Sequence, residues 1–245
     1  MQLLPDDDER EFTSMLRRLL SVGPESPALW KSLAAAGILG LTLPERHGGS
    51  GGTLVDLGAF YVEAGRELCP TIVHSTIHAG LVVDALGTAE QHAALLPGLA
   101  SGISSAATAL WSPLDASVVT PTIRTRANGD TWVLDGCVDF VLDAQTADYV
   151  LVSGRDTVTG RTLVFVVSLS CAGLRADPLT MMGGQGAACL HFDHVAVEDG
   201  LMVLGGDEGV TDDQLHRIAN TVTVLLSLDL VGVCDAALHG PSTTR

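Results

Sequence analysis

Apolar side chains recur every three to four positions along the first hundred residues, which is the period of amphipathic helices. In residues 7–20 this stripe follows an acidic first turn, which favours the start of a helix. The same period predicts helices over residues 27–36, 54–68, 73–86 and 89–99. Residues 43–52 contain one proline and four glycines, so we expect a loop there. Residues 1–103 are therefore predicted to form an N-terminal all-helical domain.

The period changes after Ser101, where short runs of β-branched and aromatic residues replace the helical stripe. These runs are bounded by Gly, Asp or Asn, and they predict strands over residues 131–135, 148–153, 161–168 and 190–197. The sequence Asn128-Gly129-Asp130 is a turn signal, so we expect neighbouring strands to pair antiparallel. Residues 104–205 are predicted to form a middle β domain.

A helical period returns near residue 207 and continues to Leu238, ahead of Gly240 and Pro241. Apolar residues occupy most sides of this helix, which favours a helix covered by other helices. The sequence shows no later helical pattern that could cover it. We expect residues 206–245 to be the first helix of a shortened C-terminal helical domain, or a helix that packs on a partner chain in an oligomer.

The charge balance excludes some partners, because 29 acidic residues face 13 basic ones and the net charge is -16. Nucleic acid and anionic membrane surfaces both require clustered positive charge, so neither is an expected partner. The N-terminal residues lack the basic and apolar regions of a secretory signal, and the apolar residues 222–238 are interrupted by Thr223, Ser227, Asp229 and Asp235. Five scattered cysteines without a C-x-x-C pair suggest reduced thiols. We therefore expect a cytoplasmic protein.

Several ordered motifs resemble the acyl-CoA dehydrogenase family. Residues 29–51, LWKSLAAAGILGLTLPERHGGSG, resemble its N-terminal helical domain, and residues 86–92 (LGTAEQH) with 96–102 (LPGLASG) resemble a later helical segment. Residues 128–136 (NGDTWVLDG) and 192–197 (FDHVAV) then match its β domain in order. The similarity covers residues 5–240, and an ordered set of motifs is more specific than any one of them.

The resemblance implies an α+β fold with an N-terminal helical domain, a middle antiparallel β-barrel domain and the start of a C-terminal helical bundle. In the family, FAD lies between the barrel and the C-terminal helices, beside an acyl-CoA thioester. A glutamate removes the α-proton while the flavin takes a hydride from the β-carbon, and hydrogen bonds to the thioester carbonyl stabilise the developing charge. The implied activity is α,β-dehydrogenation of an acyl-CoA.

The first flavin-contacting segment of the family reads TEPxAGSD, and residues 111–117 read WSPLDAS. By this resemblance Leu110, Trp111, Ser112 and Ser117 are candidate FAD-binding residues. Trp111 stands where the family carries threonine, so its indole either stacks on the ring system or fills the space of a flavin that is no longer bound.

The second segment reads G-x-K-x-W/F-I-T-N in the family and GCVDFVL over residues 136–142. Phe140, Val141 and Leu142 are therefore further candidate FAD-binding residues. Val138 replaces the lysine and Leu142 replaces the threonine, so a flavin nitrogen or oxygen facing Leu142 would lose a hydrogen-bond partner. These replacements weaken the expected polar contact without removing the cofactor prediction.

The third segment, residues 181–192, is about two residues shorter than its family counterpart, and Gln185 stands in place of an arginine. We interpret Met181 and Met182 as core residues. In most relatives the catalytic glutamate and the groups that hold the adenine end of FAD belong to the C-terminal helices, so we assign no catalytic base here.

No metal site is predicted. His74 and His78 have the i, i+4 spacing of zinc ligands but no evident third ligand, so an ordinary buried pair is the favoured interpretation. The glycines of residues 48–52 lack the Gly-Lys-Ser/Thr that completes a phosphate-binding loop.

Two functions remain open. The chain is either a subunit of an FAD-dependent acyl-CoA dehydrogenase, whose homo- or hetero-oligomeric partner supplies the base and part of the flavin pocket, or a degenerate scaffold or regulatory subunit of a true dehydrogenase. A heteromeric partner is a feature of some bacterial branches that act on bulky substrates such as steroid side chains. Flavin absorbance of the chain alone and with a partner distinguishes the two.

Overall fold

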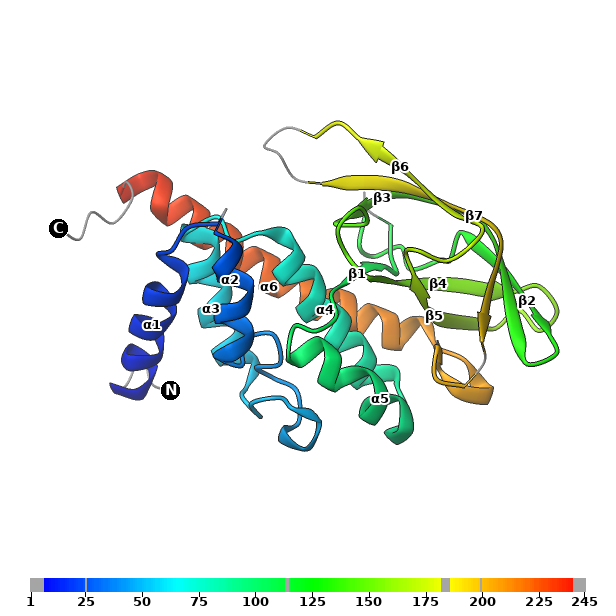
Figure 1. Ribbon diagram of the computed structural model, residues 1–245, viewed down its shortest axis with the longest axis horizontal. Helices are drawn as coiled ribbons and strands as arrows, with labels where there is room; N and C mark the ends of the chain where they lie inside the picture. Colours follow the sequence, from blue (N-terminus) through cyan, green and yellow to red (C-terminus); the bar gives the residue numbers. More distant parts are fainter. Residues whose placement is uncertain (1–6, 25, 113–114, 182–185, 199, 240–245) are drawn as a thin grey trace.

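The computed structural model describes residues 7–24, 26–112, 115–181, 186–198 and 200–239. Five helices come first, a sheet of eight strands follows, and one long helix returns along both parts (Figure 1). This order of helices, strands and a final helix confirms the predicted fold class. The predicted domain boundaries at residues 103 and 205 stay predictions.

The helical part comprises α1 (Asp7–Leu20), α2 (Pro27–Ala35), α3 (Leu54–Arg66), α4 (Thr71–Leu86) and α5 (Ala89–Ala100). Local capping explains two of these starts. Thr53 and Asp56 form a reciprocal capping box at α3, and Thr88 and Gln91 form another at α5. The apolar stripes found in the sequence face one another in a core that includes Leu16, Leu29, Leu33, Leu57 and Phe60.

The loop predicted over residues 43–52 needs one correction, because it contains a single 3₁₀ turn at Glu45–His47. Pro44 precedes the turn with φ -61°, a value suited to the entry of a helix, and Gly48 ends it with φ +82°. Proline and glycine therefore bound a short turn here.

The strands are β1 (Ala106–Ala109), β2 (Ile123–Asn128), β3 (Thr131–Leu142), β4 (Tyr149–Asp156), β5 (Thr162–Ser168), β6 (Leu174–Leu179), β7 (Ala187–Glu198) and β8 (Val203–Leu204). Their order in the sheet is β6-β7-β3-β2-β4-β5-β8, with β1 also paired to β4. The expected antiparallel barrel is corrected in two respects. β1 and β2 both run parallel to β4, so the sheet is mixed, and its described strands do not close into a barrel.

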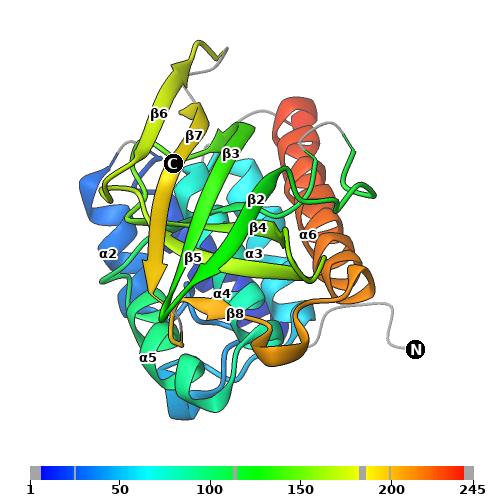
Figure 2. The same cartoon turned by 90° about the vertical axis from the view of Figure 1, so that its right-hand side faces the viewer.

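The last helix, α6 (Asp212–His239), lies along one side of the sheet (Figure 2) and continues beside the helical part (Figure 1). Leu215, Ile218 and Val222 pack in the core between α4, α5 and the sheet, whereas Leu225 packs in the core of α1–α4. α6, like α4, therefore contributes to both cores. By length and composition alone it could cross a membrane, but a single helix of this kind is weak evidence for that.

Contact between α3 and α6 is close enough to require glycine. A Cβ added to Gly65 would overlap the carbonyl oxygen of Asp229, and a Cβ added to Gly232 would overlap that of Val62. Arg66 of α3 donates from Nε to Oδ2 of Asp235 across the same interface, at 2.8 Å. Small residues and one ion pair thus bring the two helix backbones together.

Candidate functional site

Two adjoining cavities lie where β1 and β3 meet the helices. The first, which we call the sheet cavity, has a volume of about 490 Å³ and is lined by Ala109, Leu110, Trp111, Ser112, Val118, Thr120, Thr122, Cys137, Val138, Asp139, Phe140 and Ser153. The second, the helix cavity, has a volume of about 230 Å³ and lies between α4, β1, β3 and α6. Five residues line both cavities and so form their common boundary: Ala109, Trp111, Val138, Asp139 and Phe140.

An irregularity in β3 creates this boundary. Side chains alternate between the faces of a regular strand, yet the consecutive residues Val138, Asp139 and Phe140 all line both cavities. The register with β7 shifts between Val138 and Val141, which is the signature of a β-bulge, and Phe140 has φ +57°. A left-handed backbone at an aromatic residue is strained, and such strain concentrates at functional sites. The bulge therefore marks this stretch as the centre of the candidate site.

The structure places most of the sequence-predicted cofactor residues around these two cavities. Leu110, Trp111 and Ser112 line the sheet cavity, and Phe140 lines both. Val141 and Leu142 line the helix cavity instead, so Leu142 lies on the helix side of the bulge.

Ser117 lines neither cavity. Its hydroxyl donates to Asp115 at 2.6 Å, and its carbonyl oxygen lies 2.8 Å from Nε2 of His216 on α6. Ser117 therefore connects the segment after Trp111 to α6, and its proposed contact with a cofactor stays a prediction. Pro113 of the same motif lies outside the described residues, as do Met182 and Gln185 of the third segment.

Several lining residues carried no signal in the sequence. Asp139 is the only acidic residue that lines either cavity in the described chain, and no lysine or arginine lines them there. The Thr120 hydroxyl has no hydrogen-bond partner among the described residues, whereas Thr122 donates to the carbonyl of Cys137 at 2.9 Å. The sheet cavity thus combines apolar and aromatic walls with a few polar groups, which is the usual make-up of a ligand site.

One face of α4 forms a polar wall of the helix cavity. Thr71, His74, Ser75 and His78 are spaced i, i+3, i+4 and i+7, which places all four on one side of the helix, and all four line the cavity. Thr71 and Ser75 donate to the buried carboxylate of Asp143 at 2.7 and 2.6 Å, and so tie the end of β3 to α4.

The two imidazoles are buried and neutral. The Tyr61 hydroxyl lies 2.9 Å from Nε2 of His78, and the Tyr61 ring stacks on His74 with the ring centroids 4.7 Å apart. Burial lowers the pKa of His74 to about 4, and burial together with the neighbouring His74 lowers the pKa of His78 to about 3. Nε2 of His74 and Oδ1 of Asp229 are both buried without a hydrogen bond, and lie 3.6 Å apart.

These pKa shifts predict a loss of stability in mild acid. Both histidines bind a proton near pH 6.5 in the unfolded chain but only near pH 4 and pH 3 when folded, so the free energy of unfolding falls as the pH decreases below 6.5. At pH 5 the loss approaches about 2 kcal/mol per histidine. Burial also raises the pKa values of the carboxyls of buried Asp143 and half-buried Asp229, and this opposes part of the loss. Urea denaturation at pH 7 and pH 5 measures the net effect, and the double variant His74→Phe, His78→Phe should show a smaller decrease than the wild type. An equal decrease in both proteins would contradict this origin.

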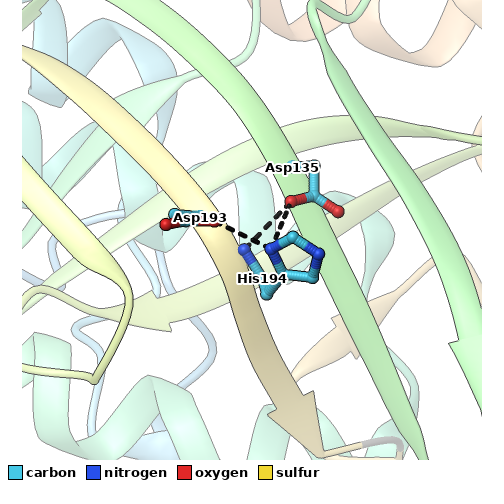
Figure 3. A group of neighbouring side chains, drawn as sticks. All are labelled: Asp135, Asp193 and His194. Atoms are coloured by element: carbon cyan, nitrogen blue, oxygen red, sulfur yellow. Dashed lines mark hydrogen bonds and ion pairs between the residues drawn. The ribbon is translucent and has the colours of Figure 1, made fainter.

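A separate group of Asp135, Asp193 and His194 lies on the surface of β3 and β7 (Figure 3). Nδ1 of His194 lies 2.8 Å from Asp193 and 3.3 Å from Asp135, and the hydrogen bond to Asp193 raises the pKa of the imidazole. All three residues have the ligand types of a metal site. However, their side chains are 35% to 88% exposed and already paired with one another, so we interpret them as a surface ion cluster.

Comparisons with known proteins agree with this architecture. Residues 9–103 match the family description "Acyl-CoA dehydrogenase, N-terminal domain". The chain is 33% identical to the acyl-CoA dehydrogenase FadE12 of Mycobacterium tuberculosis over 162 residues, which are 62% of this chain and 41% of FadE12. It is 31% identical to FadE28 of the same organism over 230 residues, 93% of this chain and 60% of FadE28. The chain therefore spans only part of the length of these relatives.

A solved structure extends the similarity to three dimensions. A variant of the Tcur3481-Tcur3483 steroid acyl-CoA dehydrogenase superposes with a TM-score of 0.79 at 27% identity, covering 95% of this chain and 65% of that chain. The matched region thus includes nearly all of this chain.

Proposed function

We propose a function from the premise that this chain belongs to the acyl-CoA dehydrogenase family, as its matched N-terminal domain and its relatives establish. The proposal is that the chain provides the flavin-ring and acyl-group sites of an FAD-dependent acyl-CoA dehydrogenase. A partner subunit provides the base and part of the FAD site. The adjoining cavities at the β3 bulge are the observation that carries it.

The flavin ring of FAD fits the sheet cavity by size and by the character of the cavity walls. A volume of about 490 Å³ lies within the range of small-molecule and cofactor sites, and Trp111 and Phe140 offer aromatic faces. Leu110, Ser112 and Thr120 would hold the ring edge, with Ser117 beyond the cavity as a more distant candidate. When bound, FAD supplies the hydride acceptor for the β-carbon of the substrate.

The acyl group fits the helix cavity. This cavity shares the bulge residues with the sheet cavity, so a thioester at the boundary would lie beside the ring while its acyl chain extends between α4 and α6. Val141, Leu142, Val222 and Leu226 would surround that chain with apolar contacts and displace water from it. A dry site strengthens the hydrogen bonds that orient the reacting carbonyl.

Charge supports the role of a partner subunit. The pyrophosphate of FAD carries negative charge, whereas the described walls of both cavities contain no lysine or arginine and the chain carries a net charge of -16. Cations from another subunit would stabilise that end of FAD. A surface for such a subunit is present on α6, where the apolar residues Val224, Leu230, Val231 and Leu238 are 54% to 80% exposed. We place the assembly in the cytoplasm.

Flavin absorbance tests this proposal. The full chain is purified alone and together with a candidate partner subunit of the same family, each with added FAD, and the bound flavin is counted per chain after gel filtration. Flavin retained only in the mixture supports the shared site. Flavin retained by the chain alone would contradict the need for a partner but not FAD binding, and no flavin in either sample would favour the scaffold function. None of these outcomes identifies the residue that acts as the catalytic base.

A further inference from the structure

The helix cavity has two chemically different sides. Its β3 and α6 walls are mainly apolar, with Val138, Val141, Val222 and Leu226, and Asp139 of β3 is the one acidic residue described there. Its α4 wall presents the hydroxyls of Thr71 and Ser75 and the imidazoles of His74 and His78. A plain hydrocarbon chain forms no hydrogen bonds, so an apolar α4 face would suffice for it.

Some of these polar groups have a structural role. Thr71 and Ser75 hold Asp143, and His78 contacts Tyr61, so their positions can be explained by the fold. His74 differs, because it is only 6% exposed and its Nε2 forms no hydrogen bond. Leaving a buried polar atom without a partner costs about 1 to 3 kcal/mol, which a well-packed apolar side chain would avoid.

Each of the two imidazoles has a second ring nitrogen that can form a further hydrogen bond. Nε2 of His74 faces the carboxylate of Asp229, so a proton on Nε2 leaves Nδ1 as an acceptor. If the Tyr61 hydroxyl donates to Nε2 of His78, then Nδ1 of His78 carries the proton and is a donor. No described residue forms a hydrogen bond with Nδ1 of either ring. Both residues line the cavity and stand four positions apart on α4, so the two rings together offer one acceptor and one donor, and a hydroxyl group can satisfy both.

We infer that the acyl group bound in the helix cavity carries a hydroxyl group on its chain, which hydrogen-bonds to His74 and His78. This inference rests on the proposed function, because it concerns the substrate class of the same site. The neutral state of both imidazoles agrees with it, since a neutral ring keeps an acceptor nitrogen that a charged ring lacks.

Binding of matched thioesters tests the inference. The FAD-loaded full chain, with its partner subunit where flavin retention requires one, is titrated calorimetrically with hexanoyl-CoA and with its 5-hydroxy and 6-hydroxy derivatives. We expect at least one hydroxy derivative to bind about tenfold more tightly than hexanoyl-CoA. The variant His74→Leu should reduce this ratio to about one. His74→Gln keeps a hydrogen-bonding side chain and should retain part of the ratio. His92→Leu, on α5 and outside both cavities, should leave it unchanged.

The possible outcomes distinguish failure of the hydroxyacyl inference from failure of the proposed function. Equal or tighter binding of hexanoyl-CoA by the wild type overturns the hydroxyacyl inference while leaving the proposed function intact. Absence of binding by all three thioesters contradicts the proposed function itself, and the inference with it. Circular dichroism of each variant shows whether a lost ratio comes from unfolding, and a folded His74→Leu protein with an undiminished ratio would also overturn the assignment to His74.

Discussion

Replacing Gly65 by alanine is expected to lower the free energy of unfolding by about 3 kcal/mol, because the new methyl group would overlap the backbone carbonyl of Asp229 in α6. Helix propensity predicts the opposite sign, since alanine stabilises a helix by about 1 kcal/mol relative to glycine. A backbone atom cannot rotate away as a side chain can, so α3 and α6 must separate. Thermal unfolding should show a decrease in Tm of roughly 6 to 12 °C for a chain of this length.

Gly80→Ala provides a matched control. Gly80 is also buried within a helix, but a Cβ there would meet only the Leu43 side chain at 3.4 Å, which is ordinary contact. This variant should be as stable as the wild type or slightly more stable. If Gly65→Ala and Gly80→Ala have the same Tm, close backbone packing does not hold α6 in place.

Replacing Ala109 by tryptophan is expected to abolish binding of both FAD and acyl-CoA. Ala109 lines both cavities at the end of β1, so a large side chain there would occupy their common boundary. The affinity of each ligand should decrease on the order of 100-fold or more, which corresponds to roughly 3 kcal/mol. Flavin absorbance after gel filtration and calorimetry with hexanoyl-CoA measure the two affinities.

Ala196→Trp controls for the bulk of the new side chain, because Ala196 is exposed on β7 and lines neither cavity. This variant should keep wild-type affinities. If Ala109→Trp loses one ligand and keeps the other, the two cavities do not share a boundary in solution. If it keeps both, neither ligand binds where we propose.

The helices could be predicted from the sequence because each carries a local signal. The apolar stripes of α1 and α4 and the capping residues Thr53 and Thr88 are properties of neighbouring residues, and the predicted bounds agree closely with the observed ones. Strands β3, β4, β5 and β7 were similarly recognised from β-branched runs. β1 and β6 were missed because one is a short run of alanine and threonine, and the other contains Pro178. β8, with two residues, was also missed, and β2 was indicated only by the turn that follows it.

Local sequence patterns could predict only part of the strand pairing in the sheet. The turn at residues 128–130 predicts the antiparallel β2–β3 pair, and that pair is present. By contrast, the parallel pairs of β4 with β1 and β2 join segments that are far apart in the chain. Such pairs are set by which edges remain free after the hairpins form, and no residue signals them locally.

The candidate functional site could likewise be predicted from the sequence only in part. Motif resemblance pointed to Trp111 and Phe140, and both lie at the boundary of the two cavities. The resemblance did not show that Leu142 has a different position from these two residues. The bulge at residues 138–141 places Leu142 in the helix cavity and not in the sheet cavity. His74 and His78 were noted for their spacing, but their burial against Tyr61 and Asp229 depends on three helices meeting.

By itself the sequence determined the helices, four of the eight strands, the acidic charge and the family, since these depend on residue type and near neighbours in the chain. Only the tertiary structure decided that the sheet of described strands is mixed and open, that a bulge in β3 places three consecutive residues at the boundary of the two cavities, and that α4 contributes a polar wall there. The physical reason is that cavities, buried pairs and glycine contacts arise between surfaces of different elements. Their energies depend on distances that are set only when those elements pack together.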